Sequence, residues 1–342
     1  METLMSQIPS DKDPRVNQLR EMIQASPLLL PWDWDQISGR IEFISLTESE
    51  YLQASFLDER MLSEKSIRGT VPYALISDID LSHRSSIGSR PCDFIFHVSH
   101  CGSTLLSRLL GSHPVCFALR EPRVLRSFHS QSPEEIRWLF GLLSRTFSQT
   151  QRALIKSTSF TSQFAQNWLS VLQDSKAILL TMPLEPFLAA VLDGSTIDIQ
   201  NHKHSRWKRL QNLGCHLPGE LDTLEVGQCA AMSWLCESLT LHKLASNHPS
   251  RTHSIDFDSL IRSPAQTLEQ CAEFLNYPSP YPDWDRDPLW QQYAKKPGVS
   301  YNTLTRDKLL NASRQKHAAE IQQGIRWVLT LQDPQVADLL NR

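Results

Sequence analysis

Hydrophobic and polar positions alternate most clearly in the middle of the chain, where short apolar runs are separated by amphipathic segments. Residues 93–98 form an apolar run that ends in small residues, which predicts a buried strand, and residues 104–110 repeat apolar side chains at helical spacing. The other predicted strands of this region cover residues 115–119, 152–155, 177–181 and 253–257. The helices between them are predicted at residues 132–147, 161–172, 185–192, 224–245 and 264–275. Strands that alternate with helices in this way predict an α/β fold with a mostly parallel sheet flanked by helices.

The two ends of the chain predict helical additions to this core. Residues 12–26 and 47–62 have the pattern of helices, the second with Thr47 and Glu50 at capping-box spacing, and residues 41–45 fit a strand. Near the other end, prolines crowd one irregular segment and a helix is predicted at residues 305–329. We therefore expect three parts: an N-terminal addition packed on the core (1–90), the core itself (91–276), and a crossing with a C-terminal helix that closes the site (277–342).

Composition narrows the classes of function. The chain has 342 residues, of which 40% are hydrophobic and 21% charged, so there is enough apolar material for a large soluble core. The net charge of −3 predicts no general attraction to nucleic acid or to an anionic membrane, so any basic site must be local. The seven cysteines include no CxxC pair, and the histidines lack carboxylate partners at metal-site spacing, so we expect neither a disulfide framework nor a metal. With no signal peptide and no membrane span recognised, a cytoplasmic protein is expected.

The segment 97–104 reads His-Val-Ser-His-Cys-Gly-Ser-Thr and joins the first strand of the predicted core to its helix. Backbone N–H groups at such a turn form an anion site, Gly102 would let the anion approach closely, and Ser103 and Thr104 add hydroxyl groups. The alternative is an ordinary strand-to-helix turn capped by Ser103. A Walker A loop would have Gly at position 97 and Lys at position 103, so ATP-driven phosphoryl transfer is disfavoured. Cys101, close to a helix N-terminus, could have a lowered pKa and act as a nucleophile.

This loop resembles the 5′-phosphosulfate loop of sulfotransferases, in which a basic residue, any residue, Gly and two hydroxyl residues follow one another, as in His100-Cys-Gly-Ser-Thr104. The resemblance runs without a gap over residues 94–190 and is closest to tyrosylprotein sulfotransferases; the whole chain is also similar to a bacterial set of sulfotransferase-like proteins. It implies a P-loop fold and sulfonate transfer from 3′-phosphoadenosine 5′-phosphosulfate, the co-substrate, to a hydroxyl or amine. The residues that it implies for donor binding are His100, Cys101, Gly102, Ser103, Thr104, Leu105, Arg123 and Lys295.

The same resemblance implies catalytic roles for residues that follow predicted strands. Glu121 matches the base, Lys156 matches the cation that stabilises developing charge, and His100 replaces a basic loop residue. Strand ends that share one edge of a parallel sheet are where ligands of α/β folds bind. Two alternatives stay open: Glu121 as a surface ion pair with Arg120 or Arg123, and Lys156 as a solvated side chain. The acceptor, whether small molecule or protein, and the oligomeric state leave no signal in the sequence.

The sequence departs from the family where the 3′-phosphate of the donor is usually held by an Arg and a Ser. Those two positions carry Thr181 and Ala189. Replacement cations are available in two basic segments, at Lys203, Arg206 and Lys208, and at Lys295 and Lys296. Charge runs of this kind are more often solvated surface. The departures motivate two further hypotheses: a non-catalytic protein that binds an anion or a nucleotide, and a transferase whose donor lacks the 3′-phosphate.

Overall fold

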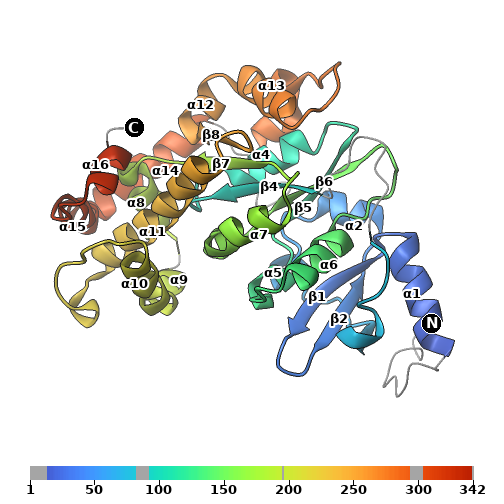
Figure 1. Ribbon diagram of the computed structural model, residues 1–342. Helices are drawn as coiled ribbons and strands as arrows, with labels where there is room; N and C mark the ends of the chain where they lie inside the picture. Colours follow the sequence, from blue (N-terminus) through green and yellow to red (C-terminus); the bar gives the residue numbers. More distant parts are fainter. Residues whose placement is uncertain (1–13, 82–91, 195, 293–302, 341–342) are drawn as a thin grey trace.

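The computed structural model describes residues 14–81, 92–194, 196–292 and 303–340. Its centre is a parallel sheet of five strands in the order β5-β6-β4-β7-β8 (Figure 1). The strands are β4 (Cys92–His97), β5 (Cys116–Arg120), β6 (Arg152–Lys156), β7 (Ala177–Thr181) and β8 (Thr252–Asp256). Each lies where an apolar run predicts a strand, and all neighbours are parallel. The predicted α/β fold with a parallel sheet is therefore confirmed.

The central strand β4 shows why the apolar runs read so clearly. All six of its residues are buried, as expected for a strand of a parallel sheet that is covered on both faces. Phe94 and Phe96 stack on each other, and Phe140 and Trp168 pack against them from two helices. This aromatic cluster fixes those helices on one face of the sheet.

Helices cover the sheet on both sides. Figure 1 shows α6 and α7 on one side and α4 and α13 on the other. The helices of this region are α4 (Ser103–Leu110), α5 (Val124–Ser127), α6 (Pro133–Leu143), α7 (Ala165–Val171), α8 (Leu184–Leu192), α9 (Ile197–Asn201), α10 (Lys203–Asn212), α11 (Val226–Asn247), α12 (Phe257–Arg262) and α13 (Pro264–Phe274). Every core helix that the sequence predicts is present, with ends that differ by a few residues.

The N-terminal part is less helical than predicted. It contains α1 (Pro14–Ala25), α2 (Glu48–Gln53), α3 (Glu59–Leu62) and an antiparallel sheet of β1 (Leu29–Asp35), β2 (Arg40–Ser45) and β3 (Gly69–Pro72). Only β2 among these strands was predicted. Pro31 weakens the strand signal of β1, and the register of β1 on β2 shifts between Pro31 and Asp33.

The single helix predicted over residues 47–62 is also wrong, because α2 and α3 are separate. The predicted capping box at the start of α2 is present, with Thr47 and Glu50 in the two reciprocal bonds. Asp58 supplies the physical reason for the break. Its carboxylate accepts a hydrogen bond from the Arg60 N–H at 3.0 Å and so begins a new helix.

Two buried arginines bind this N-terminal part to the core through its backbone. The Arg145 guanidinium donates to the carbonyl oxygens of Ile23 (2.6 Å), Ser26 (2.7 Å) and Leu29 (2.5 Å). Arg120, at the end of β5, donates in the same way to the carbonyl oxygens of Tyr51, Leu52 and Ala54. Burial lowers the pKa of Arg120 to about 10, which leaves it charged at neutral pH. Its planar set of donors suits a cluster of carbonyl groups.

The C-terminal part consists of α14 (Thr303–Lys316), α15 (Ala318–Leu329) and α16 (Pro334–Leu340), so the one helix predicted at residues 305–329 is two, which meet at His317. The helix α15 crosses α11 at two glycines. A Cβ on Gly227 would fall 2.1 Å from the Glu320 carbonyl oxygen, and one on Gly324 would fall 2.6 Å from the Gly227 oxygen. The backbones touch, so neither position has room for a side chain.

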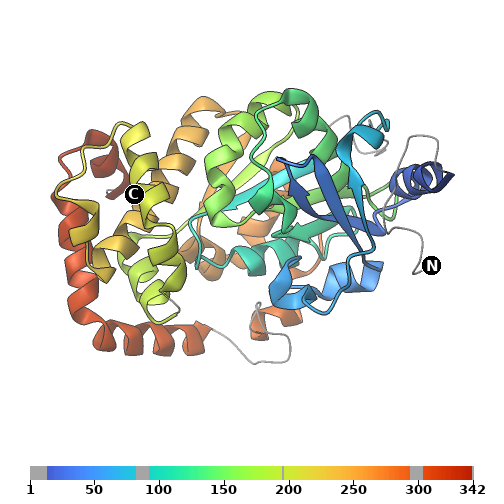
Figure 2. The same cartoon turned by 90° about the horizontal axis from the view of Figure 1, so that it is seen from below.

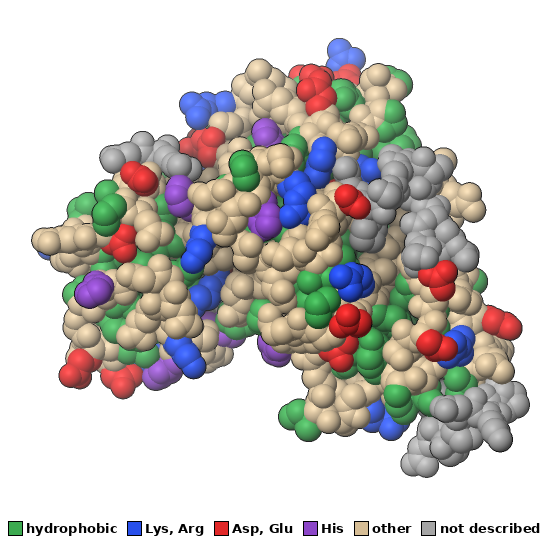
Figure 3. Space-filling view, viewed as in Figure 1, with side chains coloured by type: hydrophobic (Ala, Val, Ile, Leu, Met, Phe, Trp, Pro, Cys, Tyr) green, Lys and Arg blue, Asp and Glu red, His purple; other side chains and the backbone are tan. Residues whose placement is uncertain are grey.

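The helices α1 and α16 lie at opposite ends of the molecule (Figure 1, Figure 2). One hydrophobic core nevertheless extends through the described residues, from Val16 to Val336. On the face drawn in Figure 3, side chains of both charge signs are interspersed, in keeping with the small net charge. None of the described helices combines the length and the apolar character that crossing a bilayer would require.

Candidate active site

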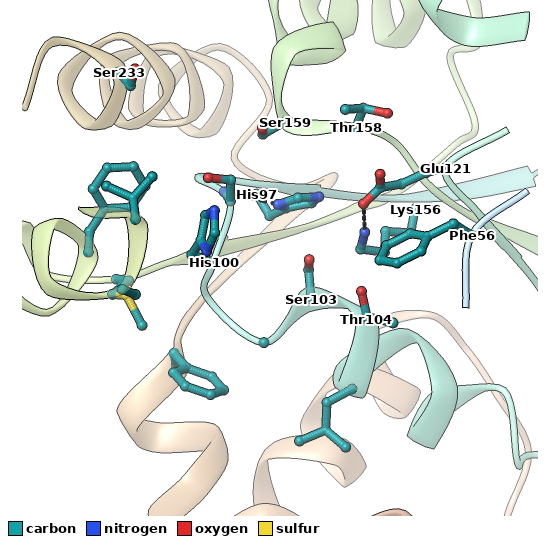
Figure 4. A pocket seen from close by; sticks show the side chains of 18 of the residues that line it. Phe56, His97, His100, Ser103, Thr104, Glu121, Lys156, Thr158, Ser159 and Ser233 are labelled. Atoms are coloured by element: carbon teal, nitrogen blue, oxygen red, sulfur yellow. Dashed lines mark hydrogen bonds and ion pairs between the residues drawn. The ribbon is translucent and has the colours of Figure 1, made fainter. Parts of the chain in front are cut away.

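A cavity of about 280 Å³ opens at the carboxyl edge of the parallel sheet. Strand ends, the start of α4, the N-terminal part and the C-terminal helices all contribute to its wall. The lining residues are Phe56, Arg60, His97, Ser99, His100, Gly102, Ser103, Thr104, Leu105, Glu121, Lys156, Thr158, Ser159, Met182, Phe187, Ala190, Val191, Ile199, Arg206, Ser233, Phe257, Gln292, Arg306 and Leu310. Figure 4 shows Glu121 and Lys156 toward one end of this cavity and Ser233 at the other.

The loop between β4 and α4 forms one wall. Its backbone is left-handed at Ser99 (φ 69°), His100 (φ 50°) and Gly102 (φ 76°). Left-handed backbone is unfavourable for the two non-glycine residues, and such strain is concentrated at functional sites. Gly102 is required twice over, because a Cβ there would also fall 2.0 Å from a ring carbon of Phe257. The resulting turn brings the backbone at the start of α4 to the cavity.

Ser103 and Thr104 begin α4 inside this cavity. Their hydroxyl groups project from the helix start toward the space in front of Glu121 and Lys156 (Figure 4). The N-terminus of a helix carries unpaired N–H groups and a partial positive charge, so it favours an anion. The position predicted for this loop, between a strand and a helix, is confirmed, and its binding of an anion stays a prediction.

Glu121 and Lys156 lie on adjacent strand ends and form a buried ion pair. Lys156 ends β6, and its carbonyl oxygen accepts a hydrogen bond of 2.7 Å from the Glu121 N–H. The Lys156 Nζ donates to Oε1 of Glu121, and the two side chains are 1% and 7% exposed. Both alternatives drawn from the sequence are wrong: Glu121 is no surface pair with Arg120 or Arg123, and Lys156 is not solvated.

Glu121 has a second cationic partner that the sequence did not reveal. Arg60 of α3 donates from Nη2 to Oε2 of Glu121, so each carboxylate oxygen faces a cation. Burial on its own would raise the pKa of Glu121, but the charges of Lys156 and Arg60 outweigh it and hold that pKa well below its usual range. The backbone of Glu121 is also left-handed, with φ 54°. Strain and pairing together fix this carboxylate in one position.

Two histidines of the loop line the cavity. His97, the last residue of β4, accepts at Nδ1 from the Ser99 N–H (3.0 Å). Its Nε2 therefore carries the proton and donates to the Ser157 carbonyl oxygen at 2.9 Å. His100 lies beside the end of α8, where a Cβ on Gly194 would be 3.8 Å from its Cε1. His100 thus occupies the wall where the resemblance implies a basic residue.

Three residues implied for donor binding lie elsewhere or outside the described part. Arg123 does not line the cavity, because its Nη1 pairs with Asp33 at 2.5 Å. Cys101 is buried behind the loop, and its Sγ lies 3.7 Å from the Leu180 carbonyl oxygen. Burial raises the pKa of the Cys101 thiol to about 12, so the lowered thiol pKa predicted from the sequence is wrong. Lys295, together with Lys296, falls in residues that the structure does not describe.

Thr181 and Ala189 occupy the positions where the resemblance implies an Arg and a Ser for the 3′-phosphate, and both make other contacts. The Thr181 hydroxyl donates to the Ile255 carbonyl oxygen at 3.3 Å, and Ala189 is fully buried against α14. Two other cations line the cavity instead. Arg206 reaches it from α10, as one of the replacements considered from the sequence, and Arg306 reaches it from α14. The Arg306 guanidinium lies 4.7 Å from the centre of the Phe257 ring and 3.3 Å from Asp258.

The residues that the sequence missed come from the two ends of the chain. Phe56 and Arg60 enter the cavity because their segment pairs with the strand that precedes Glu121. The Leu57 N–H donates to the Arg120 carbonyl oxygen (2.7 Å), and the Arg123 N–H donates to that of Leu57 (3.0 Å). A pairing between segments so far apart in the sequence leaves no local pattern, so the spacing of apolar residues could not predict it.

No protein-family model and no curated protein matches the sequence. Among solved structures, the chain is similar to sulfotransferases. The sulfotransferase domain of the curacin biosynthetic pathway is 17% identical, and the match covers 73% of this chain and 96% of that domain, with a TM-score of 0.42.

Two further matches are of the same kind. A sulfotransferase from Alicyclobacillus acidocaldarius is 13% identical over 75% of this chain and 97% of its own, with a TM-score of 0.39. A sulfotransferase from Mycobacterium avium is 12% identical over 93% of both chains, with a TM-score of 0.40.

Proposed function

We propose that this protein is a sulfotransferase-like enzyme that moves a sulfonate group from 3′-phosphoadenosine 5′-phosphosulfate to a hydroxyl or amine. The observation that carries the proposal is the buried pair of Glu121 and Lys156, which faces the anion cradle of Gly102, Ser103 and Thr104 across one cavity. Sulfonate transfer needs a base, a cation and donors for the leaving phosphate, and this wall offers all three. The loop resemblance noted in the sequence supports the same chemistry.

Each residue of the site has its own role in the proposed reaction. The acceptor oxygen or nitrogen bonds to the sulfur while the bond between the sulfur and the phosphate oxygen breaks, and the leaving phosphate keeps that electron pair. Glu121 takes the proton of the acceptor. Lys156 stabilises negative charge on the transferred group, and the N–H groups at the start of α4, with the hydroxyls of Ser103 and Thr104, hold the phosphate. His100 adds a hydrogen-bond donor at the loop.

The donor has a second phosphate, and two further cations of the cavity support a site for it. Arg206 and Arg306 line the same space as the cradle, whereas Thr181 and Ala189 are turned to other partners. Guanidinium groups bind phosphate oxygens in pairs of parallel hydrogen bonds. We assign the 3′-phosphate to these two arginines.

A second function is favoured by one observation, the strong pairing of Glu121. A carboxylate held by two cations is a weak base, so the cavity could bind a nucleotide anion and transfer nothing. A transferase with a donor that lacks the 3′-phosphate is the remaining hypothesis, and it is motivated by Thr181 and Ala189.

Thermal unfolding in the presence of nucleotides separates these functions. We expect 3′-phosphoadenosine 5′-phosphate to raise the melting temperature more than adenosine 5′-monophosphate, since only the former carries both phosphates. Arg306→Met should remove that difference. Arg314→Met is the matched control, because Arg314 is on the same helix but pairs with Glu185 outside the cavity. Equal shifts by both nucleotides in the unaltered protein would favour a donor without the 3′-phosphate.

Turnover of the donor tests the chemical step. Release of 3′-phosphoadenosine 5′-phosphate from the donor, with a set of phenols and amines as acceptors, should fall at least about a hundredfold in Glu121→Gln and Lys156→Met. Both variants should still be stabilised by the nucleotide product. Binding without turnover in the unaltered protein would support the non-catalytic function instead.

A further inference from the structure

Arg60 occupies an unusual place beside the proposed base. Its Nε lies 2.9 Å from both carboxylate oxygens of Asp58, its Nη2 binds Glu121, and its guanidinium carbon lies 3.6 Å from the centre of the Phe56 ring. The Asp58 side chain is wholly buried. The Arg60 side chain, in contrast, is 45% exposed and faces the cavity. The Arg60 guanidinium thus binds both Asp58 and Glu121 and also borders the cavity.

The pairing of Glu121 can open on one side only. Lys156 approaches Oε1 from β6 and is 1% exposed, so it has no room to leave. Arg60 approaches Oε2 from α3 and borders the cavity, where a ligand could draw it away. His97 of β4 also faces the carboxylate, but it is held by Ser99 and Ser157. Because a base must lose part of its cationic pairing before it can accept a proton, the contact with Arg60 is the one that has to yield.

The charges of this cluster indicate which kind of ligand would separate Arg60 from Glu121. Lys156 and Arg60 are positive, and Glu121 and Asp58 are negative, so the paired cluster is neutral. Transfer of a proton to Glu121 would leave the cluster with one excess positive charge in a largely buried setting, which is unfavourable. An anionic group brought in by the acceptor would restore neutrality at that moment. Arg126 does not change this balance, because its nearer partner is Glu59 at 2.5 Å.

We propose that Arg60 is a specificity-determining residue, which binds an anionic group of the acceptor and thereby releases Glu121 to take the proton of the nearby hydroxyl or amine. This inference rests on the proposed sulfonate transfer. It assigns the acceptor to a chemical class, hydroxyl or amine compounds that carry a carboxylate, sulfate or phosphate close to the reacting atom. A neutral acceptor offers Arg60 no replacement partner and leaves Glu121 paired. Phe56 keeps the guanidinium in place while it exchanges one anion for the other.

A matched pair of probes tests this preference. The acceptors 4-hydroxybenzoate and 4-hydroxybenzamide have nearly the same shape and differ in charge. With 3′-phosphoadenosine 5′-phosphosulfate as donor, kcat/KM should be at least about tenfold higher for the benzoate, and Arg60→Met should abolish that preference. Arg123→Met is the control, because Arg123 lies in the same neighbourhood with Asp33 as its partner and outside the cavity. It should keep the preference. Equal turnover of the two probes, or a preference that survives Arg60→Met, overturns the proposal.

A second measurement decides the matter even if neither probe is turned over. In protein with carbon-13 at the glutamate carboxyl groups, the Glu121 signal can be assigned by its loss in Glu121→Gln. During acidification this signal should begin to shift at higher pH in Arg60→Met than in the unaltered protein, because one of the two cations is gone. An unchanged titration means that Arg60 does not restrain the base and overturns the proposal. Thermal stabilisation by 3′-phosphoadenosine 5′-phosphate reports separately on the donor, so failure of the proposed function and failure of this inference give different results.

Discussion

The ring of Phe257, the first residue of α12, lies directly against the backbone of Gly102 in the loop before α4. A Cβ on Gly102 would fall 2.0 Å from the ring carbon Cε2. The guanidinium of Arg306 rests on the same ring, with its central carbon 4.7 Å from the ring centre. The loop before α4 is thus held between its own strand and a ring that also contacts Arg306 from the C-terminal part. Changes at this contact should affect anion binding before they affect the sheet.

Gly102→Ala should weaken binding of the nucleotide product. The added methyl group collides with Phe257, and the backbone would keep an unfavourable left-handed conformation, so the cradle must move. We expect at least a tenfold weaker affinity for 3′-phosphoadenosine 5′-phosphate and a loss of about 1–3 kcal/mol of stability. Calorimetric titration and urea unfolding measure the two effects.

The double variant Gly102→Ala, Phe257→Ala separates the two causes. Removal of the ring should recover part of the lost stability, because the collision is gone, yet the affinity should stay low, because the backbone strain persists. Strictly additive losses of stability would contradict the direct contact between these residues.

Lys156→Met should destabilise the fold as well as stop transfer. It leaves Glu121 buried with Arg60 as its remaining cation, and the loss of one partner of a buried pair costs about 3–5 kcal/mol. Chemical unfolding at neutral pH provides the measurement. The variant Lys156→Met, Glu121→Gln should lose less than the sum of the two single variants, because the buried charge is then gone too.

The pH dependence of stability should carry the signature of Glu121. Its pKa in the folded protein lies below 4.5, the ordinary value for a glutamate, so its ion pairs add stability above about pH 4.5. That contribution is lost as the pH falls from there toward the folded-state pKa. The difference in free energy of unfolding between the unaltered protein and Glu121→Gln should therefore be largest near neutral pH and shrink on acidification. A difference that grows in acid would contradict the pairing.

Arg120→Met should loosen the segment that carries Phe56 and Arg60. The change removes the hydrogen bonds that Arg120 donates to three backbone carbonyl groups, for which we expect a loss of about 3 kcal/mol. Limited proteolysis should find new cleavage sites near residues 51–58 before the sheet unfolds. Arg137→Met is the control, because Arg137 is an exposed residue of α6 and should leave the cleavage pattern unchanged.

The crossing of α11 and α15 provides a test far from the cavity. Gly227→Ala would place a methyl group against the Glu320 backbone, which cannot rotate out of the way as a side chain could, and we expect about 1–3 kcal/mol of destabilisation. Gly194→Ala, where the added methyl group makes only ordinary contacts, should cost much less in the same denaturant titration. Equal effects would mean that the helices can move apart freely.

The parts that the sequence predicted share a physical cause. The apolar runs of the parallel strands reflect burial on both faces of the sheet. Glu121 and Lys156 follow or end adjacent parallel strands, so both lie at the carboxyl edge, where ligands of α/β folds bind. What escaped prediction depends on tertiary contacts. The strand β1 contains Pro31, and Arg60 reaches Glu121 only through the pairing of Leu57 with Arg120. Residue propensities and the spacing of apolar residues predict neither the pairing of β1 nor the contact of Arg60 with Glu121.

The way in which Phe56 and Arg60 enter the cavity has a consequence for any shortened form of this protein. A fragment that begins at β4 would keep the whole parallel sheet, the cradle at Gly102, and both Glu121 and Lys156. It would lose the wall beside the carboxylate, and water would take the place of the guanidinium. Because the hydrophobic core continues from Val16 to Val336, we expect such a fragment to lose stability together with its preference among acceptors. Exchange of the segment before β4 is accordingly the place to engineer a new acceptor preference without disturbing the anion cradle.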